Sequence, residues 1–130
     1  MVKTWIETDL TPHPVGPYSQ AVRIADTLQV SGHVGINAQT GSLAGETVYG
    51  QSVQALRNIQ AIVHAACADL GDVLMLRVYR HVPEGFAELN KVFEDTSCKP
   101  YPAWPTVFGG LPPGLLVEID ALAKLSETEV

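Results

Sequence analysis

The sequence has few basic residues and no long apolar run, and each shortage argues against a class of function. Only 8 of the 130 residues are Lys or Arg against 14 Asp or Glu, which gives a formal net charge of -6. Nucleic-acid binding depends on clustered cations that release counterions from phosphate, so no nucleic-acid partner is expected. No stretch approaches the ~20 apolar residues of a membrane span, and the N-terminus does not resemble a signal peptide. We therefore expect a cytoplasmic protein without a membrane partner.

The two cysteines and four histidines show no metal-binding pattern. Cys67 lies in an apolar helical segment, which favours a small core residue, whereas Cys98 lies in a polar segment. The histidines are scattered, and neither CxxC nor HExxH occurs. The glycine-rich loops that bind nucleotide phosphates and the GxSxG turn of serine hydrolases are also missing. Neither a metal nor a cofactor is therefore expected.

The pattern of apolar residues predicts an α+β fold with elements in the order β-β-α-β-α-β-β. Short alternating runs at 21–24 and 27–31 indicate a hairpin, and the glycines of 32–45 indicate a loop. A period of three to four residues over 47–70 predicts an amphipathic helix that ends at a glycine and places Asn58 away from the apolar stripe. A second helix is expected from Phe86 onward. The remaining strands are expected at 73–79, 106–108 and 115–123.

No Pro/Ser-rich linker interrupts the chain, so one domain is expected over residues 1–130. A long helix followed directly by a strand needs a crossover connection, which predicts a mixed β-sheet with both helices packed on one face. The other face would be an exposed apolar patch in a monomer, and this favours a homo-oligomer. The polar tail, residues 126–130, is expected to fray.

The last predicted strand carries two carboxylates inside an apolar run. Its alternation places Glu118 and Asp120 on one face and four apolar residues on the other: Val117, Ile119, Ala121 and Ala123. Burial of an unpaired carboxylate is costly, so Glu118 is a candidate general acid or base with a raised pKa. The alternative is a solvated face on which both carboxylates only add solubility.

Hydroxyl groups and free backbone amides gather in the first third of the chain. The prolines of residues 11–18 favour an ordered extended loop. Gly-Pro-Tyr-Ser-Gln-Ala at 16–21 and Val-Ser-Gly at 30–32 lie beside this loop in the sequence. Such groups either orient a small polar ligand or serve only the turn and the strand edge.

Together with Pro-Ala at 102–103 and the strand 116–121, these segments resemble in order and spacing the signature of the reactive-intermediate-deaminase (Rid, or YjgF-like) superfamily. The resemblance extends from about residue 10 to residue 124. It implies a chorismate-mutase-like α+β fold, a homotrimer, and small-molecule sites in the clefts between subunits. In the family's best-known activity, 2-imino or 2-enamino acids are hydrolysed to 2-keto acids and ammonia.

The resemblance also implies roles for individual residues. Glu118 would position the attacking water, while Tyr18 and Ser31 would take part in catalysis. Asn90, which falls where the family usually has an asparagine, would complete the pocket. The substrate is expected to contact further residues of the matching segments: Gly32, His33 in place of the glutamine common after Ser-Gly, Trp104 and Thr106.

The chain departs from the family at the Pro-Ala-Arg corner, where Trp104 follows Pro-Ala. The family's arginine pairs with the substrate carboxylate as a bidentate fork, and an indole cannot replace that ion pair. Arg77, Arg80 and Lys99 could substitute, but none lies in the motif. Trp104 either stacks on a flat, conjugated ligand or fills the core or interface volume that the arginine left.

Two functions therefore remain open. The first is a divergent Rid-family hydrolase or lyase that acts on a small imine, enamine or conjugated metabolite, with Glu118 positioning water. The second is a non-catalytic trimer of the same fold that binds a small metabolite or acts like a chaperone. Retention of Glu118 favours the first, and loss of the arginine favours the second. Ribonuclease activity, often attached to the family's name, is disfavoured by the acidic charge.

Overall fold

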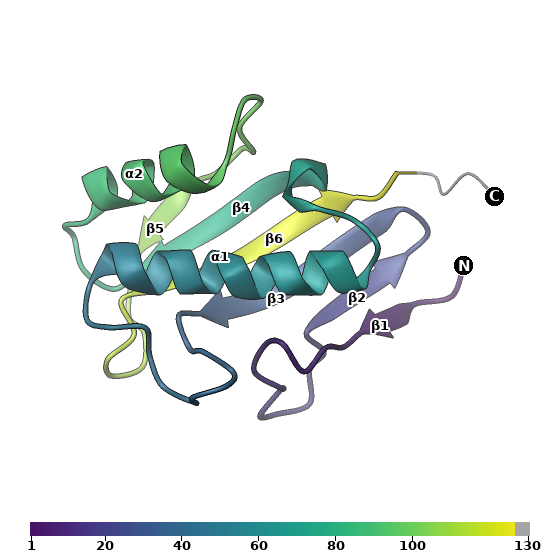
Figure 1. Ribbon diagram of the computed structural model, residues 1–130, viewed down its shortest axis with the longest axis horizontal. Coiled ribbons are helices and arrows are strands. Elements are labelled where there is room, and N and C mark those ends of the chain that lie inside the picture. The colour runs from purple at the N-terminus through teal and green to yellow at the C-terminus, as the bar shows by residue number, and fades with distance from the viewer. Residues whose placement is uncertain (127–130) are drawn as a thin grey trace.

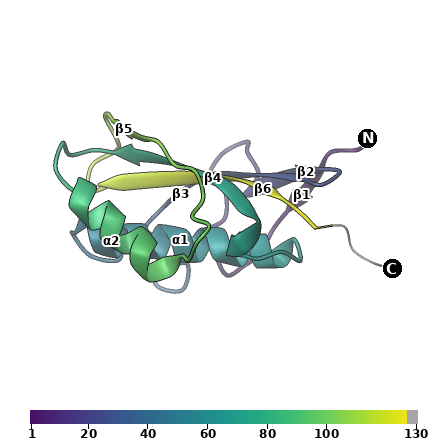
Figure 2. The same ribbon diagram turned by 90° about the horizontal axis from the view of Figure 1, so that it is seen from above.

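The computed structural model describes residues 1–126 as a six-stranded sheet with two α-helices (Figure 1). Both helices cover the same face of the sheet (Figure 2), as predicted. The strands are β1 (Thr4–Ile6), β2 (Ala21–Ile24), β3 (Thr27–Val34), β4 (Val73–Arg80), β5 (Thr106–Phe108) and β6 (Val117–Lys124). The helices are α1 (Val48–Ala65) and α2 (Phe86–Thr96). The expectation about the tail lies, for residues 127–130, outside the described residues.

The strands lie in the order β1-β2-β3-β6-β4-β5, which makes the last strand of the chain a central one. β5 runs parallel to β4, and the other neighbouring strands are antiparallel. The crossover from β4 to β5 passes through α2, and α1 connects β3 to β4 with β6 between them. The predicted mixed sheet is therefore confirmed. Within residues 1–126, no helix combines the length and apolarity that a membrane crossing needs.

The core lies between the sheet and α1. Alternate residues of the central strands point toward the helices, and Leu28, Val30 and Ile119 among them are fully buried. α1 contributes Ile59 and Ile62, which are also fully buried. Burial of each such side chain is worth about 1.5–3 kcal/mol, so this layer supplies the main stabilisation of the fold.

The first helix ends earlier than the sequence predicts. Residue Cys67 adopts a left-handed conformation with φ +62°, which terminates α1, and Asp69 then caps a separate 3-10 turn at Leu70–Asp72. The prediction that the helix extends to residue 70 was therefore wrong. The interpretation of Cys67 as a core residue was also wrong, because Cys67 lies beyond the helix and is exposed.

Three further features differ from the sequence prediction. β1 was not predicted, because a strand of three residues at a sheet edge leaves little apolar pattern. β3 continues to Val34 through the predicted loop. Asn58 is buried, not on a polar face, because its Nδ2 donates hydrogen bonds to the carbonyls of Val34 at 3.2 Å and Ile36 at 3.0 Å. The amide thus satisfies backbone groups where β3 leaves the sheet.

Gly35 marks the closest approach between the end of β3 and α1. A Cβ atom there would lie 2.6 Å from the Cα and carbonyl oxygen of Gln51, and backbone atoms cannot move aside cheaply. Gly35→Ala is therefore expected to lower the free energy of unfolding by about 1–3 kcal/mol. Gly109→Ala, with nothing within 4 Å of its added methyl group, is the matched control. Urea denaturation measures both, and equal stabilities would contradict this account of the contact.

Candidate functional site

Glu118 lies in the middle of the sheet on the face that the helices leave open. Its neighbours Val117 and Ile119 are fully buried beneath the helices, so the alternation of β6 turns Glu118 the other way. Val34 of β3 and Tyr79 of β4 are its partners on the adjacent strands. Glu118 is half-buried, and this burial raises its pKa above the usual value, with a further increase from the negative charge of Asp120.

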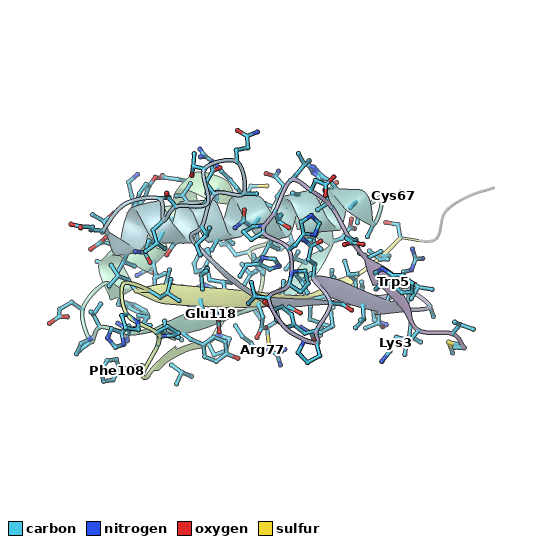
Figure 3. All side chains as sticks on the ribbon, turned by 90° about the horizontal axis from the view of Figure 1, so that it is seen from below. Lys3, Trp5, Cys67, Arg77, Phe108 and Glu118 are labelled. Carbon is cyan, nitrogen blue, oxygen red and sulfur yellow. The ribbon has the colours of Figure 1, made fainter. Side chains whose placement is uncertain are left out.

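Asp120 shares this face with Glu118 but has a different environment. Arg77 Nε donates to its Oδ1 at 2.6 Å, and the Tyr79 hydroxyl donates to its Oδ2 at 3.1 Å. Figure 3 shows Arg77 on the side of the sheet away from the helices. Among the described residues, no donor forms a hydrogen bond to the Glu118 carboxylate. Of the two carboxylates, Asp120 is therefore held in a network, whereas Glu118 is free to bind water or a ligand.

A bulge in β3 brings Gly32 against Glu118. The register between β3 and β6 shifts between Val30 and His33, which leaves Gly32 facing the carboxylate. A Cβ atom on Gly32 would lie 2.9 Å from Glu118 Cδ, so a side chain there would displace the carboxylate. Next to it, Ser31 Oγ donates to the carbonyl of Ser19 at 2.5 Å. The Ser31 hydroxyl proton is thus engaged, and its oxygen remains available as an acceptor.

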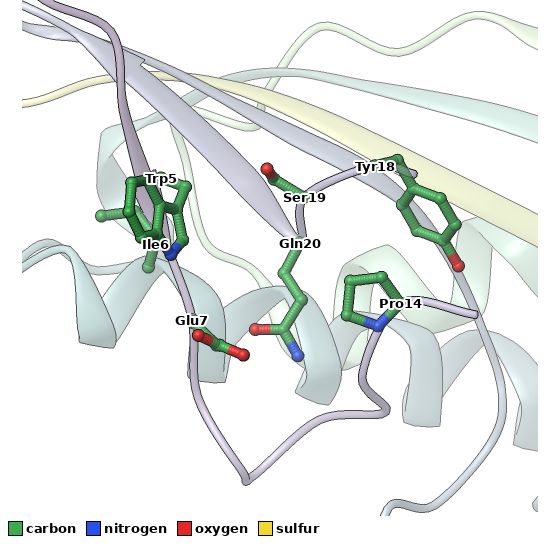
Figure 4. Close-up of a pocket in the computed structure, with 7 residues that line it drawn as sticks. All are labelled: Trp5, Ile6, Glu7, Pro14, Tyr18, Ser19 and Gln20. Carbon is green, nitrogen blue, oxygen red and sulfur yellow. The ribbon is translucent and has the colours of Figure 1, made fainter. Parts of the chain in front are cut away.

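Tyr18, Ser31, Gly32 and His33 line one pocket of about 170 Å³ between the proline-rich loop and β3. Tyr18 is half-exposed, and its hydroxyl accepts a hydrogen bond from Val15 N at 3.3 Å. A second pocket of about 250 Å³ shares Tyr18 and Gln20 with the first and is also lined by Trp5 and Glu7 (Figure 4). The fold therefore brings together four of the predicted site residues. Glu118 is not among the residues that line this pocket, but its carboxylate lies against Gly32, which is.

His33 forms the buried part of this pocket. It is only 7 % exposed, and its Nε2 has no hydrogen-bond partner among the described residues. Burial lowers the pKa of His33, although a backbone hydrogen bond with Gln20 offsets part of the decrease. A neutral imidazole donates or accepts a hydrogen bond but does not supply the positive charge that a carboxylate ligand needs.

Trp104 and Asn90 lie in a different pocket, of about 180 Å³, with Phe93, Glu94 and Tyr101. The Trp104 ring centroid is 4.5 Å from that of Phe93 and 5.8 Å from that of Phe86. Trp104 therefore packs on the core through Phe93 and at the same time forms a pocket wall. The contact with Phe93 agrees with the interpretation of Trp104 as a residue that fills core volume, and the interpretation as a wall that stacks on a ligand stays a prediction.

Neither arginine near the motif takes the place that the tryptophan occupies. Arg77 pairs with Asp120 on the open face. Arg80 Nε donates to Thr106 Oγ1 at 3.1 Å, and its Nη1 donates to the carbonyls of Pro83 and Glu84 at 2.7 and 3.2 Å. No lysine or arginine is among the residues that line the pocket of Trp104.

The predicted site residues thus form two groups that do not meet within one chain. Ser31 is on β3 and Thr106 on β5, with β6 and β4 between them, so three strand spacings of roughly 4.8 Å separate them. Thr106 pairs with the buried Val78 and faces the helices, whereas Glu118 faces the opposite side. A ligand of metabolite size therefore cannot contact Glu118 and Trp104 of the same chain together.

The sequence prediction missed several residues of these pockets. Phe93 and Glu94 line the pocket of Trp104 and follow Asn90 by three and four residues, the spacing that places side chains on one side of a helix. This spacing was the available signal. Tyr79, which donates to Asp120, is two residues after Arg77 on the same strand, and strand alternation could have identified it.

Comparison with known proteins gives consistent matches over nearly the whole chain. A family model described as Endoribonuclease L-PSP matches residues 8–125. The chain is 34% identical over 124 residues to a 2-iminobutanoate/2-iminopropanoate deaminase of Dermatophagoides farinae, covering 95% of this chain and 97% of that one. It is 38% identical over 122 residues to a RutC family protein of Sinorhizobium fredii, covering 93% and 97% of the two chains.

Solved structures agree with these sequence matches. RidA from an Antarctic Psychrobacter superposes with a TM-score of 0.89 at 38% identity, covering 94% of this chain and 99% of that one. E. coli TdcF with bound serine superposes with a TM-score of 0.87 at 31% identity, covering 95% and 99%. The family model and these relatives span the two pockets and the strand of Glu118. The chain therefore belongs to the Rid/YjgF superfamily.

Proposed function

We propose that the protein hydrolyses a small imine, enamine or conjugated metabolite, with Glu118 as the base that positions water. The observation that carries the proposal is the half-buried Glu118 carboxylate, which faces a glycine beside the Tyr18 pocket and accepts no hydrogen bond from the described residues. Relatives from Dermatophagoides farinae and Mus musculus that are named 2-iminobutanoate/2-iminopropanoate deaminases support this reaction class.

The chemistry needs one group that first accepts and then returns a proton. Water adds to the carbon of the C=N bond, and Glu118 takes a proton from that water as the C–O bond forms. That proton passes to the nitrogen and gives a carbinolamine. Glu118 then takes the proton of the new hydroxyl group as the C=O bond forms and transfers it to the nitrogen, which leaves as ammonia or an amine. A carboxyl group with a raised pKa suits both steps, because it binds the proton closer to neutral pH. Tyr18 and Ser31 would orient the substrate.

The proposal includes a homotrimer in which the two groups of site residues meet across the subunit cleft. Their separation within one chain supports this arrangement, and so does the open face of the sheet. Leu74, Val107 and Ile24 are each more than two-fifths exposed there. A partner subunit would cover this apolar surface. We also propose that the protein is cytoplasmic, and its low cysteine content is consistent with this localisation.

A non-catalytic metabolite-binding protein is the alternative, and the pocket of Trp104 favours it. In the family motif this position carries the arginine that pairs with a substrate carboxylate. Arg77 and Arg80 already have partners in this chain. Without that ion pair, the transition state of a 2-imino acid would lose a charge-assisted anchor. Turnover therefore decides between the two functions.

Glu118→Gln is expected to lower turnover strongly, because the amide neither accepts a proton from water nor returns it. The decrease should reach about 100-fold, the lower end of what general base catalysis contributes. Imines are generated by an amino-acid oxidase or an amine oxidase in the presence of the protein, and release of the carbonyl product is measured. Glu46→Gln, at an exposed loop position, is the control, and light scattering verifies that both variants assemble alike. If Glu118→Gln retains full turnover, Glu118 is not the base.

Asp120→Asn is expected to lower the pKa of Glu118. The negative charge of Asp120 disfavours ionisation of its neighbour, so its removal stabilises the ionised Glu118 carboxylate. Release of Arg77 from Asp120 would act in the same direction. Carboxyl carbon NMR shifts give the titration midpoint, which should exceed that of an ordinary glutamate in the wild type and fall in the variant. An equal midpoint in both proteins would contradict the electrostatic account.

Trp104→Arg is expected to create or raise activity on a simple 2-imino acid by about tenfold or more in kcat/KM, because a bidentate ion pair to the substrate carboxylate is restored. Trp104→Lys is the matched control, which restores the charge without the planar fork. Steady-state rates with oxidase-generated imines measure the effect. No gain in Trp104→Arg would mean that the pocket differs from the family's in more than this residue.

A further inference from the structure

The pocket of Trp104 is built mainly from aromatic rings. Three of its five lining residues are Phe93, Tyr101 and Trp104, and Phe86 packs against Trp104 from outside this set. Tyr101 and Phe86 are about half exposed, so these rings are accessible from solvent. The face of an aromatic ring carries partial negative charge, which attracts a cation placed over it.

Among residues 1–126, Glu94 supplies the only charged side chain that lines this pocket. The other charged groups of α2 have partners: Lys91 Nζ is 2.8 Å from Asp95 Oδ1, and Glu88 Oε2 accepts from Tyr49 N at 3.0 Å. Glu94 itself is exposed and accepts no hydrogen bond from the described part of the chain. The pocket therefore combines aromatic rings with a carboxylate that accepts no hydrogen bond, although Lys91, three residues earlier on α2, is near enough for the two charges to attract each other.

We propose that the pocket of Phe93, Glu94, Tyr101 and Trp104 binds a small organic cation that lacks a carboxylate. The rings of Tyr101 and Trp104 contact the cation, while Phe93 is buried and supports Trp104 from the core, and Glu94 supplies the opposite charge at the pocket edge. Asn90 offers an amide oxygen that accepts a hydrogen bond from an N–H of the ligand. A second step of this inference rests on the proposed function. Because that function places Trp104 in the catalytic cleft, the cation there is the protonated imine of an amine.

Two other ligand classes fit this pocket less well. An organic carboxylate would approach Glu94 with no lysine or arginine among the lining residues to offset the repulsion. An uncharged apolar group would gain from burial alone and would be indifferent to Glu94. Charge therefore distinguishes the three classes, and ligands of equal shape but different charge can separate them.

Choline, its uncharged analogue dimethylbutanol, in which carbon replaces the nitrogen, and dimethylbutyrate provide such a series. We expect choline to bind about fivefold or more tightly than dimethylbutanol, and dimethylbutyrate to bind more weakly than both. In NMR titrations of the 130-residue chain, the indole N–H signals of Trp5 and Trp104 report where the ligand binds. The spectrum of the Trp5→Phe variant shows which signal belongs to which tryptophan. The Trp104 signal should shift and the Trp5 signal should not.

Glu94→Gln tests the charge without removing a ring. It should weaken choline binding about threefold and leave dimethylbutanol binding unchanged, since exposed ion pairs contribute modestly. Glu84→Gln, an exposed residue of the turn before α2 outside the pocket lining, is the matched control and should change neither affinity. Both variants keep the aromatic core contacts, so a loss of binding would not reflect unfolding.

The proposal is overturned if choline and dimethylbutanol bind equally, if dimethylbutyrate is preferred, if no member of the series binds, or if Trp5 shifts instead of Trp104. It is also overturned if Glu94→Gln and Glu84→Gln behave alike. These outcomes are separate from turnover. Choline binding together with full turnover in Glu118→Gln would refute the proposed base and retain the ligand class. Lost turnover in Glu118→Gln without choline binding would support the proposed base and refute the ligand class.

Discussion

The register of β6 against its two neighbours is the constraint on which the rest of the structure depends. β6 lies between β3 and β4, and its alternate residues Val117, Ile119, Ala121 and Ala123 are fully buried beneath the helices. A shift of one residue would move this apolar set to the open face and force Glu118 and Asp120 into the core. The cost of burying two carboxylates and exposing four apolar residues therefore holds the strand in one register.

The same register gives the two carboxylates their different environments. Asp120 pairs across to Arg77 and accepts the Tyr79 hydroxyl, so it belongs to a structural network on β4 and β6. Glu118 is one pair further along β6, where β3 bulges and presents Gly32 instead of a donor. Burial raises the pKa of Glu118, and the negative charge of Asp120 raises it further. A structural carboxylate thus adjusts the acidity of its neighbour.

The two pockets differ in what they offer a ligand. The pocket of Tyr18 and Ser31 presents hydroxyl groups, backbone amides and a neutral His33. The pocket of Trp104 presents aromatic rings and the Glu94 carboxylate. In the described part of the chain, no lysine or arginine lines either pocket. Arg77 and Arg80 donate hydrogen bonds to Asp120 and Thr106 instead. This distribution disfavours a ligand whose recognition depends on its carboxylate.

The sequence by itself determined the family, the mixed sheet with helices on one face, and the alternation that places Glu118 and Asp120 together, because these depend on local periodicity and on motif order. Only the tertiary structure decided where the first helix ends, how Asn58 is buried and which partner Asp120 takes. It also decided that Trp104 lies with Phe93 and Glu94, away from Glu118. The helix end depends on the left-handed conformation of Cys67, which no residue type at that position predicts. The partners of Asn58 and Asp120 lie far away in the chain, and strand pairing creates such contacts without any local pattern that would reveal them.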